Sequence, residues 1–100
     1  MDNFKKKVLD LIKSVPRGKV TTYNEVARAL ESPGAARAVG QALNKNERPV
    51  KIPCHRVVKS DGRVGGYKLG RLAKMKLLQD EGVIIERERV ANFNEVIYFF

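Results

Sequence analysis

The sequence contains one cysteine, one histidine and no apolar run long enough to cross a bilayer. A single thiol cannot form an internal disulfide bond, and free cysteine is typical of the reducing cytosol. A transmembrane helix needs about 20 consecutive apolar residues. The N-terminal segment MDNFKKKVLDLIK interrupts its apolar positions with charge, unlike a signal peptide. We therefore expect an intracellular, cytoplasmic protein that makes no contact with a membrane.

Internal repeats, low-complexity segments and linkers are also missing from the 100 residues. This length suits one domain with a single hydrophobic core, which the 43% of apolar residues can supply. One cysteine and one histidine fall short of the four ligands of a structural zinc site. We expect a monomer that works without a metal ion or an organic cofactor.

Acidic side chains are scarce, because 11 acidic residues stand against 20 basic ones and give a net charge of +9. The excess lies in residues 1–82, which hold 18 basic and 8 acidic side chains. Such a surface suits a polyanion, because each neutralised phosphate releases a condensed counterion. The same charge also fits a soluble domain with a solvated basic surface, so a nucleic-acid partner needs support from other residues.

Two sequence breaks divide the first half of the chain into three helical segments. Pro16-Arg17-Gly18 ends an amphipathic helix, and Thr22-Tyr23-Asn24-Glu25 has the form of a capping box that opens the next one. Ser32-Pro33-Gly34 ends this second helix, and the third follows within residues 35–46. Two short helices separated by such a break predict a helix-turn-helix, although an ordinary helical hairpin has the same pattern.

The third helix is predicted to have two distinct faces. Its buried stripe consists of Ala36, Val39 and Leu43. Its second face consists of Arg37, Gln41 and Asn44. The glycine and alanines of this helix would let its backbone approach DNA closely.

The second half of the chain is less regular. Prolines 49 and 53 favour an extended or looped segment up to Val58. Residues 69–81 form a fourth helical pattern that ends at Gly82, and its inward stripe is Leu72, Met75 and Leu78. In residues 83–100, two apolar segments around Asn92-Phe93-Asn94 predict a β-hairpin. We expect residues 1–82 to form one domain and this tail to pack on it.

The only cysteine and the only histidine are neighbours, Cys54 and His55. A cysteine is a good nucleophile only as the thiolate, so it needs a positive or proton-accepting neighbour such as His55 or Arg56. Neighbours in an extended chain point in opposite directions, so Cys54 and His55 would communicate through a water molecule or a bend. The pair also fits a buried, inert cysteine beside a structural histidine.

The residues around this pair resemble a known family. IPCHRVV (residues 52–58), GGY (65–67) and LLQDEG (77–82) resemble the signature of the O6-alkylguanine-DNA alkyltransferases, and the resemblance covers residues 4 to 82. Members of this family flip an O6-alkylguanine out of duplex DNA and move the alkyl group irreversibly to a cysteine. The resemblance implies that the partner is DNA containing O6-alkylguanine.

The resemblance also implies catalytic roles. Cys54 resembles the alkyl acceptor, His55 the base that deprotonates it through a bridging water, and Glu81 the carboxylate that orients His55. Asn46 matches the asparagine that braces the active-site turn. Tyr67 resembles the residue that donates a hydrogen bond to the guanine oxygen.

A set of DNA contacts follows from the same resemblance. Arg37 matches the arginine that fills the gap left by the flipped nucleotide, and Tyr23 matches the tyrosine near the rotated phosphate. Val57 lies where the family uses backbone groups to read the flipped base. The remaining contacts are expected from Thr22, Ala36, Gly40 and Gln41.

The expected fold is mainly α with a few short strands, a winged-helix-like domain that contains the helix-turn-helix. The expected function is DNA repair by a single, stoichiometric alkyl transfer to Cys54. One alternative is an alkyltransferase-like protein, which binds alkylated guanine and recruits other repair without transferring anything. Such proteins typically replace the acceptor cysteine, which this chain keeps. A plain basic DNA-binding protein is the other alternative.

Overall fold

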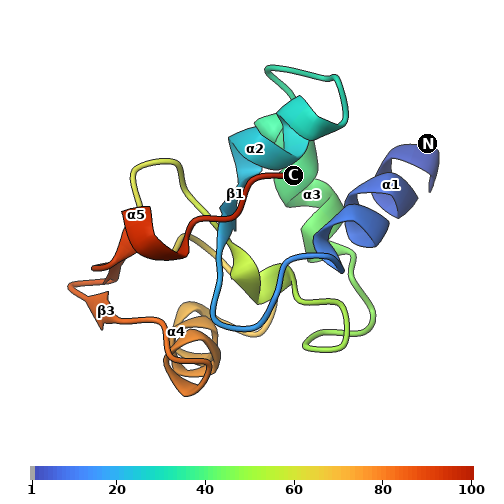
Figure 1. Cartoon of the computed structure of the whole chain (residues 1–100). Helices are drawn as coiled ribbons and strands as arrows, with labels where there is room; N and C mark the ends of the chain where they lie inside the picture. Colours follow the sequence, from blue (N-terminus) through green and yellow to red (C-terminus); the bar gives the residue numbers. More distant parts are fainter. Residues whose placement is uncertain (1) are drawn as a thin grey trace.

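The computed structural model describes residues 2–100, with side chains from Asn3 onward. In chain order its elements are α1 (Asp2–Ile12), β1 (Thr21–Thr22), α2 (Tyr23–Ala29), α3 (Ala36–Asn44), the 3₁₀-helix η1 (Cys54–Arg56), β2 (Val57–Val58), α4 (Arg71–Asp80), β3 (Ile85–Glu86), β4 (Arg89–Val90) and α5 (Phe93–Val96). The predicted fold class, mainly α with a few short strands, is confirmed (Figure 1).

The predicted helix-turn-helix consists of α2 and α3. Thr22 caps α2, because its hydroxyl accepts a hydrogen bond of 3.0 Å from the backbone N–H of Glu25. The chain leaves α2 through Glu31 and Gly34, whose φ angles of 58° and 90° are positive, and these left-handed residues reverse its direction. The local signals in the sequence therefore set both the start of α2 and the break before α3.

Within α3, the buried stripe differs from the prediction at one residue. Val39 and Leu43 are buried as predicted, whereas Ala36 is only half-buried and Ala42 completes the stripe. Ala36 is the first residue of α3, so it lies at the edge of the helix packing. This position leaves it at the molecular surface.

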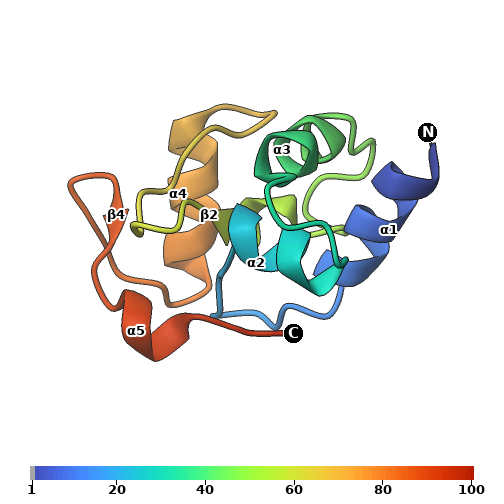
Figure 2. The same ribbon diagram turned by 90° about the horizontal axis from the view of Figure 1, so that it is seen from above.

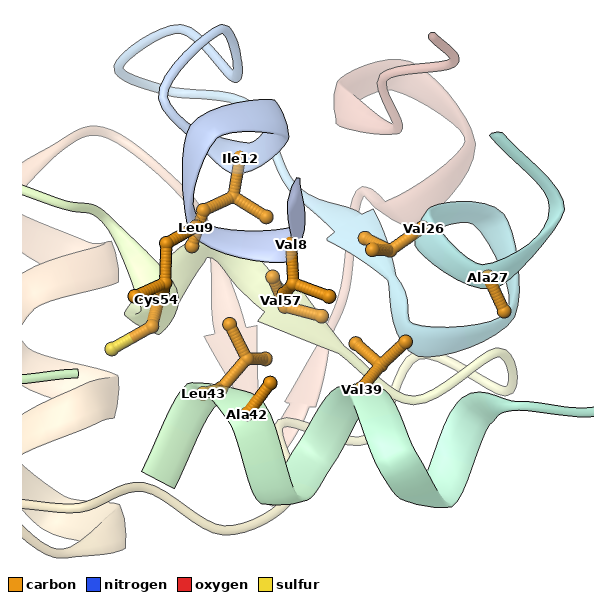
Figure 3. Packing of buried hydrophobic residues seen from close by; sticks show 10 residues of the cluster. All are labelled: Val8, Leu9, Ile12, Val26, Ala27, Val39, Ala42, Leu43, Cys54 and Val57. Atoms are coloured by element: carbon orange, nitrogen blue, oxygen red, sulfur yellow. The ribbon is translucent and has the colours of Figure 1, made fainter. Parts of the chain in front are cut away.

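One hydrophobic cluster packs α1 against the helix-turn-helix and η1 (Figure 3). Its buried members are Val8, Leu9, Ile12, Val26, Ala27, Val39, Ala42, Leu43, Cys54 and Val57. The Cys54 sulfur points away from the other side chains of this cluster (Figure 3). The backbone of the cysteine is thus anchored in the core while its sulfur faces elsewhere.

A second cluster joins α4 and the tail to the small parallel sheet. Its buried members are Val20, Val58, Val64, Leu78, Val83, Val90 and Val96. In the sheet, Thr21 pairs with Val57 and Thr22 pairs with Val58. Successive side chains of a strand point to opposite faces, so Val57 enters the first cluster and Val58 enters the second. The short strand β2 therefore connects both cores directly after η1.

The buried face of α4 differs from the predicted one. Leu78 is fully buried and Met75 half-buried, but Leu72 is 79% exposed, so its predicted inward position is wrong. Lys74 is buried instead, with no exposed area. The face toward the core follows the i, i+4 spacing of Lys74 and Leu78, which places Leu72 on the opposite side. Gly82, with φ at 94°, follows the helix as predicted.

The tail contains a β-hairpin, but the predicted strands were wrong. β3 pairs with β4 around the turn Arg87-Glu88, whereas the segment from Asn92 forms α5. The carbonyl of Asn92 accepts a hydrogen bond of 3.2 Å from the N–H of Val96, which closes a helical turn where a hairpin loop was expected. The last residues lie beside β1 instead, since the N–H of Tyr98 donates to the Val20 carbonyl at 2.7 Å.

The hairpin also pairs with an earlier loop. The N–H of Val64 donates to the carbonyl of Glu88 at 3.0 Å, and the N–H of Val90 donates to the carbonyl of Gly62 at 2.8 Å. We call residues 59–65 together with residues 85–90 the wing. The hairpin and α1 lie at opposite ends of the molecule (Figure 2).

None of the helices between residues 2 and 100 is both long enough and apolar enough to cross a membrane.

Candidate active site

A pocket of about 680 Å³ lies between α3 and the loop that follows the wing. Its lining residues are Tyr23, Ala36, Arg37, Gly40, Gln41, Leu43, Asn44, Cys54, Gly66, Tyr67 and Lys68. The pocket thus brings Cys54 together with six other residues that the sequence predicted for catalysis or DNA contact, namely Tyr23, Ala36, Arg37, Gly40, Gln41 and Tyr67. Cys54 itself is only 4% exposed, so its sulfur forms part of the inner wall.

Asn46 holds the turn that carries Cys54. Its side-chain N–H donates to the carbonyl of Ile52 at 2.9 Å and to the Cys54 sulfur at 3.2 Å. Its oxygen accepts from the N–H of Arg48 at 2.9 Å, and the residue is completely buried. Asn46 therefore braces the turn and contacts the sulfur directly.

His55 contacts Glu81 rather than Cys54. Its Nε2 lies 2.9 Å from the Glu81 carboxylate, and the ring is completely buried. Its Nδ1 has no hydrogen-bond partner among the described residues. Because a carboxylate only accepts hydrogen bonds, Nε2 carries the proton in the neutral ring and Nδ1 is the basic nitrogen. The arrangement therefore leaves one nitrogen ready to accept a proton.

Arg56 binds the same carboxylate through two hydrogen bonds. Its Nε donates to one Glu81 oxygen at 2.9 Å and its Nη2 to the other at 2.8 Å, while Nη1 donates to the carbonyl of Val15 at 2.8 Å. Sequence reasoning treated Arg56 only as a possible direct activator of Cys54. The structure places its guanidinium on Glu81 in a bidentate pair instead.

The electrostatics of this trio keep the histidine neutral and the carboxylate charged. Burial raises the pKa of Glu81, but the hydrogen bonds from Arg56 and His55 outweigh it and hold that pKa below its ordinary value. Burial lowers the pKa of His55 despite the opposing effect of Glu81. At neutral pH the ring is therefore a neutral base next to a fixed negative charge.

Tyr67 lies beside both members of the Cys54-His55 pair. Its ring packs edge-on to the His55 ring, with 6.4 Å between centroids, and its buried hydroxyl has no hydrogen-bond partner among the described residues. Burial and the nearby Cys54 raise the pKa of Tyr67 to about 12. The hydroxyl therefore stays protonated at neutral pH and can donate a hydrogen bond into the pocket.

Lys74 is a functional candidate that the sequence reasoning missed. Its ammonium donates to the carbonyls of Val57 at 2.7 Å and Gly66 at 3.0 Å, and it lies 5.8 Å from the ring centroid of Tyr23. Burial lowers the pKa of Lys74 to about 7, although the electrostatic effect of the nearby Cys54 opposes this shift. Lys74 thus ties β2, directly after η1, to the loop that carries Tyr67. The only signal in the sequence was its i, i+4 spacing from Leu78.

The remaining predicted DNA contacts fall into two groups. Arg37 and Gln41 are exposed on α3 and line the pocket. Thr22 and Val57 are buried and do not line it, since the Thr22 hydroxyl caps α2 and the Val57 carbonyl accepts from Lys74. Contact of these two residues with DNA stays a prediction.

Metal ligation has no support in residues 2–100, where no group of three or more histidine, cysteine, aspartate and glutamate side chains could hold an ion.

Residues 3–83 match the family described as 6-O-methylguanine DNA methyltransferase, DNA binding domain. The methylated-DNA–protein-cysteine methyltransferase of Methanothermobacter thermautotrophicus is 46% identical over 83 residues, which are 83% of this chain and 46% of that protein. Mycobacterium tuberculosis OGT in complex with DNA has a TM-score of 0.77 and 38% identity, over 79% of this chain and 49% of the other. The chain thus spans about half the length of the curated relatives it matches.

A second solved structure is similar over nearly the whole chain. S. pombe Atl1 in complex with damaged DNA containing O6-carboxymethylguanine has a TM-score of 0.88 and 36% identity, over 98% of this chain and 96% of that one. The family match stops at residue 83, but this structural match takes in nearly all of the tail. The hairpin and α5 therefore have counterparts in a solved protein.

Proposed function

Because the chain belongs to the 6-O-methylguanine DNA methyltransferase family through its DNA-binding domain, we propose that it repairs DNA by moving the alkyl group of an O6-alkylguanine to Cys54. The observation that carries this proposal is the position of the cysteine. Its sulfur lines a pocket beside α3, accepts a hydrogen bond from Asn46, and belongs to the same turn as a histidine held by Glu81. A merely structural cysteine needs none of these partners.

The first chemical step is the formation of the thiolate. The Cys54 proton passes through a bridging water to Nδ1 of His55, and Glu81 stabilises the imidazolium that results. The sulfur electron pair then attacks the alkyl carbon, the bond between that carbon and the guanine oxygen breaks, and the electron pair of this bond stays on the base. One proton neutralises the guanine, so the protein loses the thiol proton and gains a thioether.

Tyr67 assists the leaving group. Its protonated hydroxyl donates a hydrogen bond to the guanine oxygen, where negative charge develops as the bond breaks. Its raised pKa of about 12 keeps it a donor across the physiological range.

The substrate base must leave the duplex to reach the sulfur. A flipped base can enter the pocket of about 680 Å³, while α3 lies along the duplex. Arg37, exposed at the pocket edge, then fills the gap in the base stack. Gly40 and Ala36 on the same face allow the helix backbone to approach the DNA closely.

The alternative is a protein that binds alkylated guanine without transferring the group. The likeness over 98% of this chain to Atl1, solved in complex with DNA that contains O6-carboxymethylguanine, supports binding of such a base. The complete set of Cys54, His55 and Glu81 favours transfer, because a binding protein does not need a basic histidine behind a thiol.

Mass spectrometry after incubation with an O6-methylguanine duplex tests the proposal. We expect one methyl group per chain, on the peptide that contains Cys54, and no further turnover because the chain has no second thiol to remove the group. Cys54→Ser should bind the duplex with nearly unchanged affinity and transfer nothing. Binding by the unaltered chain without any mass increase would establish the alternative, and methylation at another residue would contradict the assignment of the nucleophile.

A further inference from the structure

A second pocket, of about 240 Å³, lies in the wing and outside the active site. It is built by three segments that are distant in sequence, namely the loop 59–65, the first residue of α4 and the hairpin turn. Its lining residues are Lys59, Arg63, Val64, Gly65, Arg71, Arg87 and Glu88. The fold thus gathers four cationic side chains around one small cavity.

Carboxylates neutralise only part of this charge. Glu88 pairs with Arg71 at 2.9 Å, and Asp61 lies 3.5 Å from Arg63. Lys59 and Arg87 make no ion pair within the described residues. The pocket therefore keeps a positive excess that an anion can complement.

The hairpin turn that supplies Arg87 is held in an unusual conformation. The φ angles of Arg87 and Glu88 are 51° and 63°, so both central residues of the turn are left-handed. Asn-Gly is the preferred pair for such a turn, and neither residue here has that preference. The pairing of Val64 with Glu88 and the Arg71–Glu88 ion pair hold the turn in place. Local sequence preference thus does not explain why this turn carries Arg87 at the pocket.

The wing pocket is continuous with the surface around the active site. A further pocket, of about 250 Å³, shares Tyr23 and Ala36 with the active-site pocket and shares Lys59 with the wing pocket. The longest dimension of the molecule is 36 Å, which equals about ten base pairs at 3.4 Å per pair. One duplex that lies along α3 can therefore also reach the wing.

From this arrangement we propose that Lys59, Arg63, Arg71 and Arg87 form a binding site for a phosphodiester of the DNA backbone that flanks the target nucleotide. Guanidinium groups fit phosphate oxygens with paired hydrogen bonds, so a cavity lined by three arginines suits a phosphate. The site rests on the proposed function, since it needs the chain to bind duplex DNA. It adds a second anchor that positions the duplex without contacting a base.

The salt dependence of DNA binding tests the site. The variant Arg63→Gln/Arg87→Asn removes two cations, and asparagine tolerates the left-handed conformation at residue 87. Lys7→Gln controls for the loss of a remote cation, because Lys7 is exposed on α1 at the opposite end and lines none of the described pockets. Both variants are compared in a Cys54→Ser background, so that no transfer occurs, and thermal unfolding checks that they fold.

The expected readout is the slope of log affinity against log salt for an O6-methylguanine duplex. Loss of one phosphate contact lowers the steepness of this slope by about 0.9, with a several-fold loss of affinity. Lys7→Gln should keep the slope of the parent protein. Arg63→Lys, which keeps the charge, should have a slope close to that of the parent. Equal slopes in the double variant and its parent would overturn the site while leaving the proposed function intact. Absence of duplex binding in every form would overturn both.

Two further measurements identify the anion. In one set of duplexes, a single phosphate is replaced by a neutral methylphosphonate. At one flanking position this replacement should weaken duplex binding by the parent protein and leave binding by the double variant unchanged. Inorganic phosphate at constant ionic strength is added while the amide signals of Arg63 and Arg87 are followed by NMR. Phosphate binding at the wing without any methylphosphonate effect would make this a site for a small free anion and overturn the DNA assignment.

Discussion

At the scale of single residues, the proposed reactivity of Cys54 depends largely on groups that the sulfur does not touch. His55 is buried and neutral, Glu81 is ionised at 2.9 Å from it, and Arg56 fixes both oxygens of that carboxylate. Proton transfer to His55 creates an imidazolium in a buried site, where an adjacent negative charge matters more than it would in water. In the proposed mechanism, the carboxylate therefore sets how readily the thiolate forms.

Glu81→Gln should slow the reaction of Cys54 at neutral pH. Glutamine keeps the size of the side chain but removes the charge that stabilises imidazolium, so thiolate becomes scarcer at neutral pH. The rate of Cys54 alkylation by iodoacetamide, measured against pH, should shift its midpoint upward. Asp80→Asn is the control, because it removes an exposed carboxylate one position earlier. An identical profile in folded Glu81→Gln would reduce Glu81 to a structural role.

Lys74→Met should remove a rise in stability with pH. The folded pKa of Lys74 is about 7, against 10.5 for the free side chain. Between these values the unfolded chain binds more protons than the folded one, so stability increases with pH by up to about 1.4 kcal/mol per unit. Tyr67, with its pKa raised from 10.0 to about 12, opposes this trend only above pH 10.

Urea unfolding at pH 7, 8 and 9 provides the measurement for this residue. Lys74→Met should give a nearly flat profile, because methionine keeps the unbranched side chain without an ionisable group. Lys76→Met, two positions later and 78% exposed, should keep the rise of the unaltered protein. A rise that persists in Lys74→Met would assign the pH dependence to other groups.

At the scale of elements, α3 connects the proposed DNA-binding surface to the candidate active site. Its inner face packs through Val39 and Leu43, and its outer face presents Arg37 and Gln41 at the pocket. A rigid helix with both roles sets the distance between the base stack and the sulfur. Loss of a side chain from the outer face should therefore affect base flipping without disturbing the core.

Arg37→Ala should weaken repair of intact duplex more than repair of a target that is already unpaired. Flipping costs a few kcal/mol, and an inserted arginine recovers part of this cost only where a stacked base has left. Transfer rates on a paired duplex and on a duplex with an abasic site opposite the lesion provide the measurement. Lys45→Ala, at the C-terminal end of α3, controls for loss of charge. Equal losses on both substrates would make Arg37 a simple phosphate contact.

The elements that could be predicted from the sequence are those with local signals. The capping box at Thr22 and the Ser32-Pro33-Gly34 break define α2 and α3, because the groups involved are neighbours in sequence. The burial of Lys74 depends on carbonyls of Val57 and Gly66, and no local pattern predicts such a distant contact. The same holds for the direction of Arg56 toward Glu81.

The hairpin in the tail is another feature that local sequence patterns do not predict. Asn92-Phe93-Asn94 has turn-forming residues, but the turn forms at Arg87-Glu88, which lack them. Pairing of β4 with residues 62–64 and burial of Val90 decide the register. Long-range packing therefore outweighs the local turn preference here.

At the scale of the whole molecule, two hydrophobic clusters are joined through β1 and β2. Val96→Ala should lower the free energy of unfolding by about 1.5 kcal/mol, since it removes two buried methyl groups from the second cluster. Phe99→Ala removes a larger side chain that is 63% exposed, so it should change stability little. Urea unfolding of both variants provides the comparison. A greater loss in Phe99→Ala would mean that the end of the chain contributes more to packing than its exposure indicates.

The order of the active-site residues along the chain determines when the site can form during synthesis. Cys54 is translated before Lys74 and Glu81, and β1 closes onto β2 across a long loop. Local helices form early during folding, whereas such non-local contacts form late. A nascent chain that has passed residue 54 but not residue 81 therefore carries an ordinary thiol without its activating partners. Under the proposed function, newly made protein can react with DNA only when nearly the whole domain has left the ribosome.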